Sequence, residues 1–220
     1  MFRKIISRNA KTCEVIVSKI FPAGCGWQFG SILASYNNCN PSDLDFMMTC
    51  GMCEGLAVGM GHLVYMVGKD TVTEEVDLNQ EMYRSIQYGS GSMLSGIVWQ
   101  PAVDYFRDDG FLPTVMATGV CCGAFFFGGL VLSKYITKKH SKEIVTIETI
   151  KNNALLSLSI GGAAGMFVAT DPLINDNFLR TVYGIGDSLS FDSIYMAGFA
   201  TASGFMLIQS IQNLGKNWVD

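Results

Sequence analysis

Glu54 and His62 are the residues whose type and position could do chemistry. Glu54 lies inside an apolar run, eight residues after Phe46, where an ionised carboxylate is costly unless it is paired or hydrated. His62 follows at i+8, so the two side chains lie on roughly one side of a helix. A glutamate that exchanges a proton and a histidine that relays it would form a proton or cation path. The alternative is a protonated or hydrogen-bonded Glu54 that contacts Ser, Thr or Asn of a neighbouring helix, with His62 meeting water.

Cys50 and Cys53 form a C-x-x-C pair in the same run. A redox pair needs a partly exposed site that stabilises a thiolate, whereas Glu54 beside these cysteines disfavours one. A zinc site would need two more ligands, which the nearby sequence does not supply. We therefore expect no catalytic residues, no metal and no bound cofactor, and a bridge between Cys39 and Cys50 stays open.

The composition indicates a protein whose solvent is lipid. Only 15 % of the 220 residues are charged and 49 % are hydrophobic, and the chain contains 24 glycines. A soluble domain carries roughly 25 % charged residues. Disordered chains need higher charge, and disulfide-stapled secreted domains need more than 7 cysteines in this length. The net charge of −4 argues against a nucleic-acid partner, which would require a basic stripe.

Six runs almost free of charge approach the length of about 20 residues that a helix needs to cross a bilayer. We expect an all-α polytopic integral membrane protein, a single transmembrane domain over residues 1–220 with six helices in three hairpins. The expected spans are 20–40, 46–68, 85–103, 110–133, 152–170 and 193–214.

The basic residues indicate how the chain is oriented. Of the 15 lysines and arginines, only Arg107 and Arg180 lie on one side of the expected spans, and the other 13 lie on the side of the termini. Basic residues stay on the cytoplasmic or matrix side, so both termini are expected inside. The basic, amphipathic segment 1–19 is typical of mitochondrial targeting and favours the mitochondrial inner membrane with the termini in the matrix. The alternative is another cellular membrane with the termini in the cytoplasm.

Two further groups of residues are expected to make contacts. Small residues four apart allow helices to approach closely in lipid, either within this chain or with other subunits. The small residues expected to do so are Gly51, Gly55, Gly59, Gly119, Gly123, Gly161, Gly165, Gly198 and Ala202. Lysines after the fourth span are candidates for binding lipid head groups such as cardiolipin. These are Lys134, Lys138, Lys139 and Lys142.

Two functions follow from these patterns. The first is a non-catalytic, supernumerary subunit of a large mitochondrial inner-membrane complex, such as the respiratory chain or ATP synthase. Its partners would be other membrane subunits and phospholipids. The alternative is a small solute or ion transporter or channel, proton-coupled, that uses Glu54 and His62.

Overall fold

The structure, a computed structural model, describes residues 10–73, 76–137, 146–175 and 191–217. Every regular element within these ranges is helical, so the prediction of an all-α chain is confirmed there. The elements are η1 (Ile16–Ile20), α2 (Phe21–Tyr36), α3 (Leu44–Thr73), α4 (Leu78–Phe106), η2 (Arg107–Asp109), α5 (Phe111–Thr137), α6 (Ile147–Asn175) and α8 (Phe191–Asn217).

The first helix includes residues before 20, where the first span was expected to begin. The chain is helical from residue 10 and continues without a break through η1, a π-helical turn, into α2. Ser18, Lys19 and Ile20 are all buried in η1. A π-turn is wider than an α-turn and is often found at functional positions. Residues 10–19 are therefore part of the first helix and not a separate segment.

Local signals fix several helix ends. α2 ends at Tyr36, short of the expected residue 40, because Asn38 adopts a left-handed φ of 59° and reverses the chain. α4 begins at Leu78, because the Asp77 side chain accepts a hydrogen bond from the backbone N–H of Gln80. Between α4 and α5 the chain turns through η2 and Gly110, whose φ is 101°.

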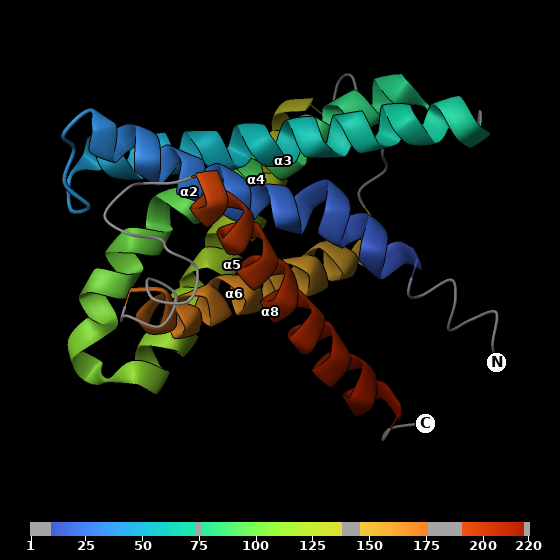
Figure 1. Cartoon of the computed structure of the whole chain (residues 1–220). Helices are drawn as coiled ribbons and strands as arrows, with labels where there is room; N and C mark the ends of the chain where they lie inside the picture. Colours follow the sequence, from blue (N-terminus) through green and yellow to red (C-terminus); the bar gives the residue numbers. More distant parts are fainter. Residues whose placement is uncertain (1–9, 74–75, 138–145, 176–190, 218–220) are drawn as a thin grey trace.

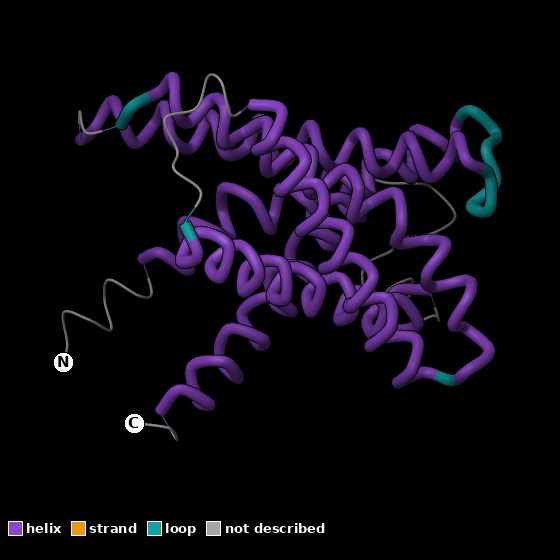
Figure 2. Tube along the Cα trace, turned by 180° about the vertical axis from the view of Figure 1, so that it is seen from behind, coloured by secondary structure: helices purple, strands orange, loops and turns teal. Residues whose placement is uncertain are grey.

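The helices form a closed ring. α2 contacts α3, α3 contacts α4, and the sequence continues through α5, α6 and α8 until α8 contacts α2 again. In Figure 1 the α2–α3 and α4–α5 connections lie at one end of the bundle, whereas the last residues of α3 and the first residues of α4 lie at the other. We call the first end the 37–43 end and the second the 73–78 end. Figure 2 shows the same helices from behind.

Glycine contacts join neighbouring helices of the ring. A Cβ added at Gly55 would lie 2.6 Å from the backbone oxygen of Gly89, and one added at Gly119 would lie 2.8 Å from that of Gly161. Gly51, Gly59, Gly123, Gly165 and Gly198 likewise lie against neighbouring helices, and Ala202 is buried. These positions allow close backbone approach between helices of the same chain.

Among the residues that the structure describes, three helical segments are long and apolar enough to cross a membrane. They are Leu44–Thr73, Phe111–Thr137 and Ser193–Ile211. The expected spans 85–103 and 152–170 are helical too. α4 is less apolar because it buries polar side chains inside the ring, among them Gln87, Ser92 and Ser95. The seven cysteines are all free thiols, so Cys39 and Cys50 are not bridged.

Candidate functional site

One face of α3 points into the ring. Cys50, Glu54, Val58 and His62 follow one another at i+4 and are all buried, with 7 % of Glu54 and 2 % of His62 exposed. This spacing keeps the four side chains on one face of an α-helix. Glu54 therefore enters the interior of the bundle, where Gly96 of α4 leaves room for its carboxylate.

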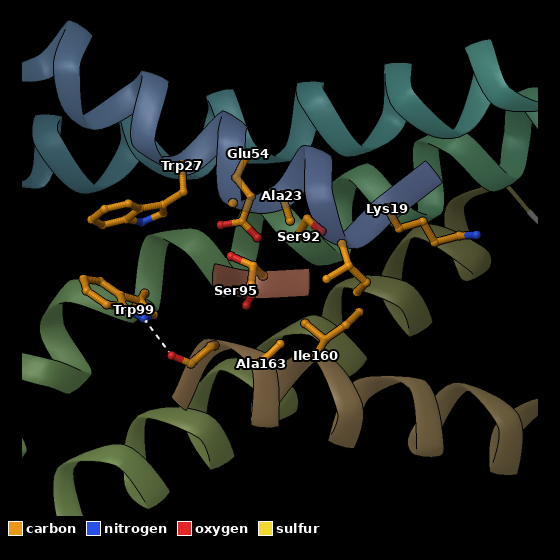
Figure 3. Close-up of a pocket in the computed structure, with 13 residues that line it drawn as sticks. Lys19, Ala23, Trp27, Glu54, Ser92, Ser95, Trp99, Ile160 and Ala163 are labelled. Carbon is orange, nitrogen blue, oxygen red and sulfur yellow. Dashed lines mark hydrogen bonds between the residues drawn. The ribbon is translucent and has the colours of Figure 1, made fainter. Parts of the chain in front are cut away.

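The Glu54 carboxylate faces a cavity of about 50 Å³ inside the ring. Residues of η1, α2, α3, α4, α6 and α8 line this cavity. A water molecule needs roughly 10–15 Å³ of such space, so the cavity has room for a few small atoms. Figure 3 shows Glu54 directed into this space from above, toward the side of the cavity that holds Ser92 and Ser95.

Two serine hydroxyls of α4 share the cavity with Glu54. Ser92 and Ser95 are 2 % and 3 % exposed, and both line the cavity. Within the part of the chain that the structure describes, neither hydroxyl has a hydrogen-bond partner, and Glu54 has no hydrogen bond or ion pair. Buried polar groups normally have such partners. The arrangement therefore leaves one carboxylate and two hydroxyls available to a ligand.

Aromatic and aliphatic side chains lie at the two ends of the cavity. Toward the 37–43 end, the rings of Trp27 and Trp99 meet edge to face with their centroids 4.5 Å apart. Trp99 is held in place by a 3.3 Å hydrogen bond from its Nε1 to the backbone oxygen of Ala164. Toward the opposite end lie Ile160 and the stem of Lys19, whose ammonium points away from Glu54 (Figure 3).

A second polar cluster lies nearer the 73–78 end and involves His62. The His62 Nε2 atom lies 2.8 Å from Oε2 of Glu81, and Arg84 donates a 2.6 Å hydrogen bond to Oε1 of the same carboxylate. The ring of Tyr88 packs against His62 at a centroid distance of 5.0 Å. The ammonium of Lys19 lies 4.4 Å from the centroid of the Tyr88 ring. We call these five residues the His62 cluster.

The charges of the His62 cluster shift one another's protonation. Burial alone would raise the pKa of Glu81, but the hydrogen bond from His62 and the charge of Arg84 outweigh it and hold that pKa below its usual value. Burial lowers the pKa of Lys19 to about 8, although Glu14 and Glu81 favour its charged form. Glu81 is therefore an ionised carboxylate with two partners, in contrast to Glu54.

The structure brings together residues that the sequence pattern did not connect. Glu54 and His62 share a face of α3, but His62 pairs with Glu81 and does not line the cavity. Ser92 and Ser95 were not among the expected site residues. Their i+3 spacing, which places both hydroxyls on one face of a helix, is a signal that could have identified them.

The remaining candidates lie away from the cavity. Cys50 is buried near Gly30 of α2, and Cys53 is half-buried. No group of three or more His, Cys, Asp or Glu side chains suited to a metal ion occurs in the described ranges. Lys134 lies near the end of α5. The other lysines expected to bind lipid, Lys138, Lys139 and Lys142, lie outside the described residues.

Comparisons of this chain with models of protein families, with curated proteins and with solved structures found no match.

Proposed function

We propose that the protein is a membrane transport protein that binds a small cation at Glu54, inside a bundle of membrane-crossing helices. One observation carries the proposal. A buried carboxylate without an ionic or hydrogen-bond partner among the described residues faces an interior cavity. Ionisable groups within membrane segments are costly, and they commonly mark the path of an ion or substrate.

The proposed topology has six crossings, at the expected spans, with both termini on the inner side. Two observations support it. The described connections α2–α3 and α4–α5 lie at the same end of the bundle (Figure 1), and with the expected spans 13 of the 15 basic residues of the sequence would lie on the side of the termini. The basic segment at the start of the chain favours the mitochondrial inner membrane as the location.

The cavity fits a carrier better than an open pore. Trp27 and Trp99 lie at one end of it, and Ile160 and the Lys19 stem lie toward the other. Its volume of about 50 Å³ is too small for a continuous column of water past Glu54. Release to either side requires these side chains to move, as in transporters whose site is exposed to one side at a time.

Flux measurements in proteoliposomes test the proposal. The purified full chain should move protons or other small cations down a gradient, and Glu54→Gln should reduce the flux to the level of empty vesicles. Glu148→Gln makes the same substitution at an exposed position on α6 and should leave the flux unchanged. Equal flux through wild-type protein and Glu54→Gln, or none through either, would contradict the proposal.

A second candidate function is that of a subunit in a large inner-membrane assembly with phospholipids around it. The observation that favours it is a groove of about 540 Å³ between α5 and α6, lined by exposed apolar side chains such as Val120 and Leu158. A helix of another subunit or a lipid chain would fill this groove. The mass of the native particle in mild detergent tests this function, because a particle containing the chain alone would rule out a stable assembly.

A further inference from the structure

We propose that the cation bound at Glu54 is a small primary ammonium ion, such as methylammonium. This inference rests on the proposed transport function and names its substrate class. It follows from the way in which the cavity is divided. One wall carries a carboxylate and hydroxyls, whereas the rest consists of apolar and aromatic side chains.

The polar wall matches the hydrogen-bonding capacity of a primary ammonium group. Such a group has three N–H donors and no acceptor. Glu54 supplies two carboxyl oxygens from α3, and Ser92 and Ser95 each supply a hydroxyl oxygen from α4. The Thr201 hydroxyl of α8 lines the cavity and donates its hydrogen to the backbone oxygen of Ala197, so its oxygen can act only as an acceptor there. Acceptors from three helices thus face one small space.

The apolar wall accommodates a short alkyl group. Ile20, Ala23, Ile160 and Ala163 line the cavity beside the polar residues. The volume of about 50 Å³ limits the ligand to a few non-hydrogen atoms. Trp27 and Trp99 add electron-rich rings at one end, and aromatic rings attract cations. A ligand with one charged end and one or two carbons satisfies both walls.

The oxygen atoms that line the cavity fit divalent metal ions poorly as ligands. Calcium takes six to eight oxygen ligands, and magnesium requires an octahedral shell. The cavity offers a single carboxylate and three hydroxyls. The protein's own primary ammonium nearby, that of Lys19, is directed to the Tyr88 ring and leaves Glu54 open.

Equilibrium dialysis of the purified full chain with labelled methylammonium tests the substrate class. We expect saturable binding that ammonium and ethylammonium displace. Tetramethylammonium has the same charge but no N–H donor, so it should compete at least about tenfold more weakly. Equal competition by tetramethylammonium, or displacement by sodium at equal concentration, would overturn the inference. Both comparisons use wild-type protein and so do not depend on a variant that folds.

Variants then locate the ligand. Ser92→Ala combined with Ser95→Ala should weaken methylammonium binding by at least about tenfold, because it removes two hydrogen bonds to a charged group. Ser90→Ala is the matched control, since this hydroxyl lies on the same helix, bonds to the backbone oxygen of Ile86 and does not line the cavity. Unchanged affinity in a folded Ser92→Ala, Ser95→Ala protein would contradict the proposed site.

The outcome also separates this inference from the transport function. If Glu54-dependent flux of protons or sodium occurs but methylammonium neither binds nor inhibits it, the substrate class is wrong and the transport function stands. If methylammonium binds at Glu54 but is not transported by the wild-type protein, the binding site stands and the carrier function fails. If no cation binds or crosses, both proposals fail.

Discussion

Two acidic side chains lie beside the same face of α3, and they differ in whether the carboxylate has a partner. Near the 73–78 end, His62 meets Glu81, and Arg84 occupies the other oxygen of that carboxylate. Two turns away, Glu54 has no hydrogen bond or ion pair within the described residues. Buried Val58 lies between Glu54 and His62 on this face. The two regions are thus close along one helix but separated by an apolar side chain.

The difference indicates which charges stabilise the fold and which serve a ligand. Removing one member of a buried ion pair leaves the other without compensation, so a paired cluster depends on all its members. A carboxylate without a partner makes no such contribution and costs free energy to bury. In the proposed function, Glu54 is retained because it binds a cation. The comparison therefore predicts opposite effects for equivalent substitutions at Glu81 and Glu54.

The largest effect is expected for Glu81→Gln. This substitution removes the charge that His62 and Arg84 share, and the free energy of unfolding should fall by about 4 kcal/mol. Thermal unfolding of the purified chain in detergent measures the loss. A change below about 1 kcal/mol would mean that the His62 cluster does not stabilise the bundle, and the contrast with Glu54 would disappear.

The next largest effect concerns Lys19, which touches both regions. Burial holds its pKa near 8, against 10.5 for an ordinary lysine, so the unfolded chain binds the additional proton between these values. The free energy of unfolding should therefore rise as the pH increases through this window, by up to roughly 3 kcal/mol. Lys19→Met removes the group and should abolish this rise relative to wild type. An identical pH dependence in both proteins would contradict the assignment.

A smaller effect is expected at Gly96, which makes room for the Glu54 carboxylate. A methyl group there would overlap Oε2 of Glu54 and lie 3.0 Å from the Cα atom of Gly51, so Gly96→Ala should displace the carboxylate, strain the α3–α4 contact and lower the free energy of unfolding by about 2 kcal/mol. Gly128→Ala is the matched control, because an added Cβ there meets nothing within 4 Å. The control should be neutral or slightly stabilising, and thermal unfolding distinguishes the two glycines.

The smallest effect on stability is expected for Glu54→Gln. The side chain keeps its size and loses no hydrogen bond or ion pair to the described residues. The free energy of unfolding should therefore rise by no more than about 1 kcal/mol. Cation binding should be lost in the same variant. A large loss of stability at Glu54 would make it a structural residue, like Glu81.

The sequence predicted the helical elements better than their contacts. Apolar runs give the positions of the long helices, because a helix satisfies its own backbone hydrogen bonds in lipid. They did not reveal that residues 10–19 continue the first helix, since the basic charge of that segment is typical of a separate surface helix. Glycines four apart predicted close contacts, but spacing carries no information on whether the facing helix belongs to the same chain. Gly55 and Gly119 face Gly89 and Gly161 of this chain.

The site was predictable only in part. Glu54 stands out because a charge within an apolar run is rare. The pairing of His62 with Glu81 depends on the antiparallel placement of α3 and α4, which no local pattern encodes. That Ser92 and Ser95 line the cavity beside Glu54 follows only from the packing of α4 against α3. Distant contacts of this kind come from the fold and not from the spacing of residues along one helix.

The contact between α2 and α8 bears on how the chain is made. Because the ring closes only where the last helix meets the first, the cavity stays open at its side until synthesis has reached α8. Before that point the cavity lacks the part of its wall that Thr201 of α8 supplies. In the proposed membrane topology, a nascent chain released before α8 would have an incomplete bundle and should be removed by quality control.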